Sequence, residues 1–357
     1  MTDYTNKLNS DYAYVRPFVF KKQSVTRTCV KMIVFLFIEV CLLAASGSYS
    51  ALINIGCTVG ASLLAYLISI IQKKEVWYTS FITVLQGLLF GMLLPETYPP
   101  LAAFFVVFIL MTLCRSIFHG IYNIWANIIC FGVVIAWVIG KSFFPDFLLS
   151  QDLIGMRNSS LYLIQNGDFP VSSFDSSVTS FLNNSVFKIL KVSVPEGYVS
   201  MLWDSHSTIP AFRFNVINLL ASVFLFADES LDYKITGIFL LVYCILVRLF
   251  VPFIYGGAFN SGDIILALFS SGLLFSSVFV MQWVGTMPSS KIGKVVYAFL
   301  MGIITFLIVG CGTSGIGFMY CILSGNIVTV IIRVIENQND SKRILKLFKN
   351  TKGEIVK

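Results

Sequence analysis

A carboxylic acid within an apolar run is the first residue whose type and position could support chemistry. Glu39 lies near the middle of the apolar run 30–46. An ionisable side chain in such surroundings costs free energy, and residues of this kind commonly mark ion paths or proton relays. A carboxyl group that only hydrogen-bonds a neighbouring helix or subunit gives the same pattern. Glu39 is therefore a candidate for a proton or cation path, and a structural role is the alternative.

Residues that usually bind metals or nucleotides do not form a recognisable motif here. The sequence contains no P-loop, GxGxxG, HExxH or GxSxG pattern. His119 and His206 lie far apart in the chain, and none of the eight cysteines forms a CxxC or another iron–sulfur spacing. We therefore expect no disulfide, no iron–sulfur cluster and no paired-histidine metal site.

The elements that position these residues follow from the composition. Of the 357 residues, 57% are apolar and only 12% are charged, and the mean hydropathy is +0.83. A soluble domain carries about a quarter charged residues, so a water-soluble globule, a disordered chain and a nucleic-acid binder are excluded. The net charge of +7 then reflects the excess of Lys and Arg on the inner side of a membrane.

Ten apolar runs are long enough to predict an all-α bundle of about ten transmembrane helices. A helical span takes about 20 residues. The runs cover 30–46, 50–71, 78–95, 100–118, 124–140, 210–227, 235–252, 262–284, 295–311 and 315–335. The sequence thus divides into an N-terminal tail (1–28), a first five-helix half (29–140), a polar loop (141–209), a second five-helix half (210–335) and a basic tail (336–357).

The distribution of basic residues predicts the orientation of the bundle. With both termini on the inner side, 19 of the 25 Lys and Arg residues fall on inner segments. This bias predicts a multi-pass protein with both termini inside. The loop 141–209 then faces outward, which is the periplasmic side if the membrane is the inner membrane of a bacterium.

The two halves share a short sequence. Gly-Leu-Leu-Phe occurs at 87–90 and again at 272–275, in the third run of each half. Five spans per half give the halves opposite orientations, which is the inverted repeat common in proteins that move small solutes or ions. Chance is the alternative for so short and apolar a match.

An ordered set of motifs resembles the RnfD/NqrB family. Residues 85–100 resemble the family's GLLLxLxLPPTxP segment, and 118–127 its FGGLG and NxFNPA segments. Residues 270–281 are similar to SGGL…FFMATDP, 293–297 to GRxIFG, and Asn326 matches an Asn of the last span. Together these matches run from about residue 30 to 335.

The resemblance implies a flavin-carrying subunit with about ten spans. Family members carry FMN linked through phosphate to the Thr of an S-G-A-T motif. Here Ser176 and Thr179 match the Ser and Thr, Ser177 and Val178 replace the Gly and Ala, and Asp175 is the nearest carboxylate. The resemblance thus implies covalent FMN on Thr179, with Ser176 and Asp175 beside it, and a riboflavin as a possible second flavin. An ordinary Ser- and Thr-rich loop is the alternative.

The resemblance also implies the assembly in which the chain works. Rnf and Na⁺-NQR complexes couple electron flow between NADH and ferredoxin or quinone to movement of Na⁺ or H⁺. We therefore expect an electron-transfer subunit of an Rnf-type ion-translocating oxidoreductase, active only in the complex. Its partners would be the other subunits, a flavin transferase for maturation and membrane lipid, but no nucleic acid. The rivals are a secondary transporter or channel that has lost the flavin, and a structural membrane anchor.

Overall fold

The computed structural model describes residues 24–72, 79–118, 126–145, 169–190, 193–255, 259–260, 262–283, 285–310 and 314–355. Most of the predicted tail 1–28 and the middle of the loop 141–209 lie outside these described residues. All regular secondary structure among the described residues is helical, so the predicted all-α fold is confirmed.

Helices occupy each of the ten predicted apolar runs. The first half contains α2 (Val25–Ala45), α3 (Tyr49–Ile71), α4 (Ser80–Leu93), α5 (Pro100–Phe118), α6 (Ile128–Ile139) and the short η3 (Lys141–Phe143). The connecting region contains α9 (Asp175–Leu190), α10 (Tyr198–Trp203) and η4 (Pro210–Phe212). The second half contains α11 (Asn215–Ala227), α12 (Tyr233–Tyr255), α13 (Ile264–Ser270), α14 (Leu273–Phe279), α15 (Lys291–Val309) and α16 (Gly317–Ile355).

Within the described ranges, five helices are long and apolar enough to cross a membrane. They are α2, α3, the Tyr233–Ile254 part of α12, α15 and the Gly317–Lys342 part of α16. The helices α4, α5, α6 and α11 contain shorter apolar stretches. The chain is therefore a multi-pass membrane protein.

Side-chain caps fix where several of these helices begin. The hydroxyl of Ser24 accepts a hydrogen bond from the Arg27 amide (3.2 Å) at the start of α2, and Ser290 accepts one from the Gly293 amide (2.9 Å) at the start of α15. Asn127 and Asp263 cap α6 and α13 in the same way. Such caps satisfy backbone N–H groups that have no partner within the helix, so the helix starts are encoded locally.

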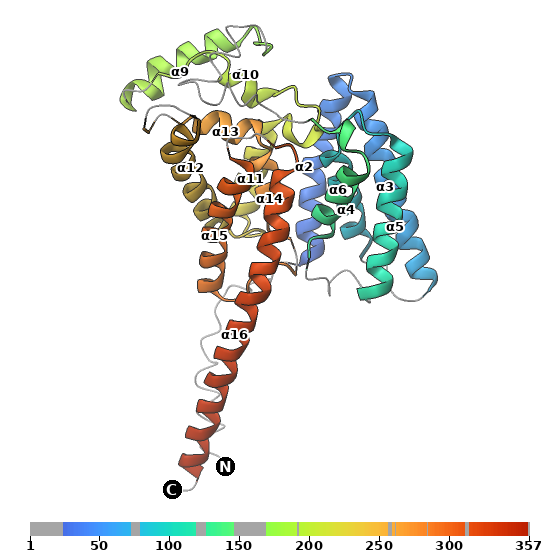
Figure 1. Ribbon diagram of the computed structural model, residues 1–357, viewed down its shortest axis with the longest axis vertical. Coiled ribbons are helices and arrows are strands. Elements are labelled where there is room, and N and C mark those ends of the chain that lie inside the picture. Colours follow the sequence, from blue (N-terminus) through green and yellow to red (C-terminus); the bar gives the residue numbers. More distant parts are fainter. Residues whose placement is uncertain are drawn as a thin grey trace, which may run out of the picture.

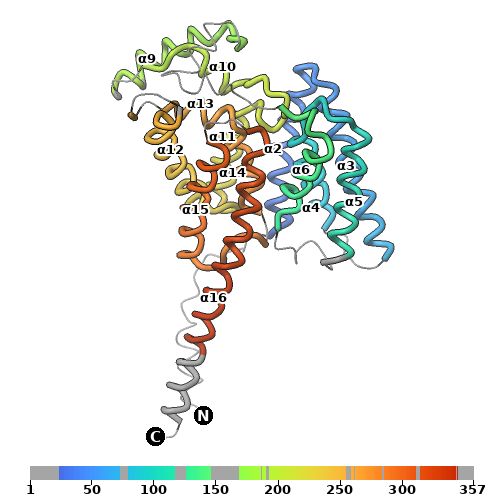
Figure 2. Tube along the Cα trace, in the orientation of Figure 1, coloured from blue at the N-terminus to red at the C-terminus, as the bar shows by residue number. Residues whose placement is uncertain are grey.

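The pattern of helix contacts repeats between the two halves. In the first half α2 packs on α4, α3 on α5, and α5 on α6. In the second half α11 packs on α14, α12 on α15, and α15 on α16. The halves meet where α2 contacts α11 and where α6 contacts α16. Figures 1 and 2 show the blue-to-green first half beside the yellow-to-red second half.

The repeated Gly-Leu-Leu-Phe segments adopt different structures. Gly87 lies within α4, where a Cβ atom would come 2.8 Å from the Val59 Cα, and Gly91 would likewise meet the Ile55 Cα at 2.6 Å. These small residues let α4 approach α3 closely. Gly272 instead has a positive φ of 65° and separates α13 from α14. The single span expected over 262–284 is therefore two short helices.

The polar loop and the C-terminal tail lie at opposite ends of the bundle. Helices α9 and α10 cover one end, and α16 projects from the other (Figure 1). This arrangement agrees with the predicted placement of the loop 141–209 and of the tail 336–357 on opposite faces. It also shows that α16 continues helically beyond the predicted last span. We call the end with α9 the outer end and the opposite end the inner end.

Candidate functional site

Glu39 lies in the membrane-spanning helix α2 and is almost completely buried. Its side chain is 1% exposed and shares the buried face of α2 with Cys29, Met32, Leu36 and Leu43. Neither carboxyl oxygen has a hydrogen-bond partner. An ionised carboxylate in such a place is very costly unless it is paired, so Glu39 is the most unusual polar group of this helix.

The contacts of α2 show which helices face Glu39. The Phe35 and Phe224 rings lie 5.8 Å apart, and the Lys31 ammonium donates to the Ser230 hydroxyl (3.1 Å). These contacts define an antiparallel pair in which Glu39 lies level with about residue 220 of α11. The helix α4 packs against α2 as well. Glu39 thus belongs to the contact region of α2, α4 and α11.

Two amide side chains on these neighbouring helices are also buried without partners. Asn218 on α11 is 1% exposed and Gln86 on α4 is fully buried. Neither the amide nitrogen nor the oxygen of either residue forms a hydrogen bond. The α2–α11 pairing places Asn218 within one helical turn of the level of Glu39. Helices α4 and α11 carry no charged residue, so neither helix brings a counter-charge to Glu39.

Charged side chains gather at the two ends of α2 instead. At the inner end Lys31 forms an ion pair with Asp228. At the outer end Arg213 donates to the Asp204 carboxylate (2.6 Å) and to the Ser48 hydroxyl (2.6 Å). Glu39 therefore lies between these two groups of charged side chains and is part of neither.

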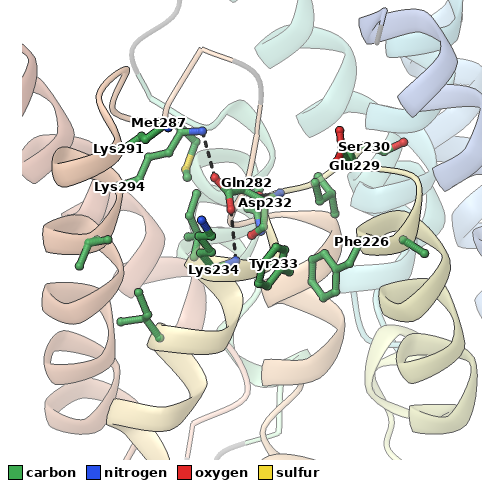
Figure 3. Close-up of a pocket in the computed structure, with 15 residues that line it drawn as sticks. Phe226, Glu229, Ser230, Asp232, Tyr233, Lys234, Gln282, Met287, Lys291 and Lys294 are labelled. Atoms are coloured by element: carbon green, nitrogen blue, oxygen red, sulfur yellow. Dashed lines mark hydrogen bonds and ion pairs between the residues drawn. The ribbon is translucent and has the colours of Figure 1, made fainter. Parts of the chain in front are cut away.

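A groove of about 820 Å³ opens at the inner end of the second half. It lies between the α11–α12 connection, the segment after α14 and the start of α15 (Figure 3). Gln282 holds this region together: its carbonyl accepts from the Asp232 amide (2.9 Å), and its amide nitrogen donates to the Thr236 hydroxyl (2.8 Å). Lys294 pairs with the Asp232 carboxylate at 3.1 Å. This role of Gln282 was not predictable from the sequence, because a single amide after an apolar run has no recognisable pattern.

The predicted flavin-attachment residues lie on a helix at the outer end rather than in an irregular loop. Asp175 begins α9 and is fully buried. Its carboxylate accepts hydrogen bonds from the Thr179 hydroxyl (2.8 Å), the Gly197 amide (3.0 Å), the Ser200 amide (2.7 Å) and the Ser200 hydroxyl (2.5 Å). Asp175 therefore ties α9 to α10.

The electrostatics of Asp175 follow from these bonds. Burial alone would raise the pKa of its carboxyl group. The hydrogen bonds from Ser200, Gly197 and Thr179 outweigh burial and lower the pKa below its usual value. Asp175 is consequently a carboxylate at neutral pH. Asp175 and Thr179 are four residues apart, so their side chains lie on one face of α9.

The Thr179 hydroxyl does not fit a phosphoryl linkage in this arrangement. Thr179 is 3% exposed, and its hydroxyl points to the Asp175 carboxylate. A phosphate ester there would place a second negative charge beside a buried carboxylate, which is strongly unfavourable. Ser176 and Ser177, by contrast, are exposed. Covalent FMN on Thr179 stays a prediction. The role of Asp175 in joining α9 and α10 was not predicted from the sequence.

The part of the chain that the structure describes contains two candidate ligand types for metals, His and Cys, whose positions can be compared with those of Asp and Glu. In those residues no group of three or more His, Cys, Asp and Glu side chains lies close enough to hold a metal ion. His119 lies outside the described residues. His206 is exposed and lies 3.9 Å from Asp204.

Comparison with known proteins agrees with the motifs and with the helical architecture. No curated protein matches the chain. The family model described as NQR2, RnfD, RnfE matches residues 13–342, which include both halves, Glu39 and the outer segment. The chain therefore belongs to the NQR2, RnfD, RnfE family, the membrane subunits of Rnf- and NQR-type ion-translocating oxidoreductase complexes.

Proposed function

We propose that this subunit carries the coupling cation through the membrane part of an Rnf- or NQR-type complex, and that Glu39 binds the cation on its way. The observation that supports this proposal is the carboxyl group of Glu39, which is buried and lacks any hydrogen-bond partner. Redox chemistry in partner subunits would supply the driving force.

The Glu39 side chain can be ionised or neutralised by a bound cation, and the two states differ in free energy. Ionised Glu39 is destabilised by the apolar face that it shares with Leu36 and Leu43. Binding a cation neutralises the carboxylate and removes this penalty. A nearby charge that changes during electron transfer shifts the balance between the two states, because electrostatic interactions are strong where the dielectric constant is low. Glu39 can thus alternate between a loaded and an unloaded state.

The test compares Glu39→Gln with Glu39→Asp in the assembled complex. Gln keeps the shape but cannot ionise, so we expect ion-coupled turnover to fall about 100-fold, the lower limit for loss of a proton-transferring side chain. Asp keeps the charge and should retain a measurable part of the rate. The control is Glu96→Gln, the same chemical change on a half-buried residue beyond the end of α4. Unchanged turnover and ion dependence in Glu39→Gln would remove Glu39 from the path.

Electron transfer through covalently bound FMN is the second candidate, and family membership supports it. FMN would supply a carrier able to accept one or two electrons. Because the Thr179 hydroxyl donates a hydrogen bond to Asp175 of the same helix, attachment there requires the Thr179 side chain to rotate away from Asp175 first. Exposed Ser176 needs no such change. A bound riboflavin, which the resemblance also implies, has no assigned residues.

In-gel fluorescence tests this second candidate. The chain is produced with a flavin transferase, denatured and examined for flavin fluorescence at its band. Loss of the signal in Thr179→Ala but not in Ser176→Ala supports attachment at Thr179. Loss only in Ser176→Ala moves the attachment to Ser176. A wild-type band without fluorescence contradicts covalent flavin and leaves the cation-carrying role as the function.

A further inference from the structure

A second hollow connects the inner groove to the face of α2 that carries Glu39. This cavity of about 200 Å³ is lined by Cys29 and Met32 of α2 and by Ile82 and Leu85 of α4. It shares three lining residues with the larger groove, namely Ser230, Leu231 and Gln282. The two hollows therefore adjoin, and together they lead from the inner end toward the interior of the bundle.

The cavity follows the same stripe of side chains as Glu39. Cys29, Met32, Leu36 and Glu39 are spaced by three or four residues and lie on one buried face. The cavity ends at Met32, and Glu39 lies seven residues further along the helix, about 10 Å at a rise of 1.5 Å per residue. Leu36, which is fully buried, is the side chain on this stripe between the cavity and the carboxyl group.

The surroundings of Glu39 indicate which cation they suit. A dehydrated metal cation is held by several oxygen ligands, often more than one of them charged. Among the described residues, the helices packed on α2 bring no charged side chain to this level. Helices α4 and α11 have none, α3 contributes only the titratable Tyr49, Cys57 and Tyr66, and α2 itself adds Cys29 and Cys41.

Charged groups lie in ion pairs at the two ends of α2, and Arg115 of α5 is buried and donates to the Thr83 hydroxyl of α4 (2.7 Å). The ion pairs are Lys31 with Asp228 at the inner end and Arg213 with Asp204 at the outer end. Asn218 on α11 and Gln86 on α4 add unpartnered amide groups but no charge. They are too few to replace the hydration shell of a metal ion. A proton needs no such shell, because it binds covalently to one carboxyl oxygen.

We infer that the cation taken up by Glu39 is a proton, and that it arrives from the inner groove along the stripe of Cys29, Met32 and Leu36. This inference rests on the proposed function. In the uptake step, a hydronium ion in the cavity gives its proton to a Glu39 carboxylate oxygen, so one O–H bond breaks, another forms, and water remains. Met32, whose side chain is flexible, and Leu36 lie between the cavity and Glu39, so the proton reaches Glu39 when these side chains move.

Transport measurements with the complete complex in vesicles test the nature of the cation. Proton movement is followed with a pH-sensitive dye in the lumen, and Na⁺ uptake is followed with radioactive sodium. We expect redox-driven proton movement without added Na⁺, reduced about 100-fold in Glu39→Gln. Na⁺ uptake that depends on Glu39, without proton movement, would contradict the inference that the cation is a proton and would leave the proposed function intact. Transport that is independent of Glu39 would overturn both.

Cysteine labelling tests the route. Met32→Cys and Val34→Cys are exposed to a charged thiol reagent applied to the inner face, and modification is quantified by peptide mass spectrometry. Met32 lines the cavity. Val34 is 53% exposed on the lipid-facing side of the bundle, where lipid excludes a charged reagent. We expect Met32→Cys to react at least about tenfold faster. Equal rates, or reaction of Met32→Cys only from the outer face, would overturn the inner route. Native Cys29, which lines the same cavity, provides an internal reference in both variants.

Discussion

Asp175 and Glu39 are carboxyl groups of similar burial, 0% and 1% exposed, but their surroundings are opposite. Asp175 accepts four hydrogen bonds from Thr179, Gly197 and Ser200. Glu39 accepts none. A buried carboxylate with a full set of donors holds its neighbours in place, whereas one without donors weakens the fold. The comparison separates a carboxyl group that builds the structure from one whose presence calls for a functional explanation.

The two residues also differ in what the local sequence supplies. Asp175 begins a helix, where a negative charge interacts favourably with the helix dipole, and Gly197 presents its amide from a left-handed backbone conformation with φ of 100°. Glu39 lies within a 21-residue span, more than one turn from either helix end. Substitutions at the two sites should therefore affect stability and transport in opposite ways.

The largest effect on stability is expected from Asp175→Ala. It leaves two backbone amides and two hydroxyl groups without an acceptor, which costs about 3 kcal/mol or more. Hydrogen exchange at Gly197 and Ser200 should become much faster, because α10 is released from α9. The control is Ser177→Ala, which changes an exposed hydroxyl of the same helix. Unchanged protection in Asp175→Ala would show that other contacts hold α9.

Glu39→Leu should change stability in the other direction. Replacing a buried, unpartnered carboxyl group with an apolar side chain of similar size is expected to stabilise the bundle by about 1–2 kcal/mol. Thermal unfolding in detergent measures the change, while ion-coupled turnover should be lost. Ile38→Leu, at a surface position of the same turn, controls for repacking. Clear destabilisation in Glu39→Leu would mean that Glu39 has a stabilising partner.

Much of the fold is predictable from sequence because the membrane imposes simple rules. Apolar runs of sufficient length must form helices that satisfy their own backbone groups, and each predicted run does contain a helix. The break at Gly272 was not predictable in this way. Residues 262–284 read as one span, and the break depends on a tertiary contact, since a Cβ atom on Gly272 would come 2.0 Å from the Phe212 ring.

The candidate site was predictable only in part. Glu39 stands out in the sequence because a carboxylate is rare in an apolar run. The cavity on the same face of α2 depends on Ser230 and Gln282, which are distant in sequence and follow no motif. The motif around Thr179 predicted a modified hydroxyl, but motif matching takes no account of the direction of a side chain. Ser200, which completes the cluster around Asp175, lies 25 residues from Asp175 and gives no local signal.

A smaller effect is expected from Thr179→Val, which removes one of the four bonds to Asp175. Valine has nearly the same shape as threonine, so the cost is that of one hydrogen bond, about 1 kcal/mol. Hydrogen exchange at the Ser200 amide should accelerate less than in Asp175→Ala. The two substitutions combined should lower the free energy of unfolding little more than Asp175→Ala alone. Fully additive effects would show that Thr179 stabilises α9 through contacts other than Asp175.

The pH dependence of the outer layer provides the finest test of the comparison. The pKa of Asp175 is lowered in the folded protein, so the group stabilises α9 fully above the unfolded aspartate pKa of about 4. That stabilisation is lost as the pH falls further, through the folded pKa, because the protonated acid is a poorer acceptor. Proteolysis between α9 and α10 should therefore accelerate only below about pH 4. Asp175→Asn should abolish this dependence, since it removes the titrating group, whereas Glu39→Gln should leave it unchanged because α2 does not hold α9. A dependence that persists in Asp175→Asn would assign the acid response to another carboxyl group.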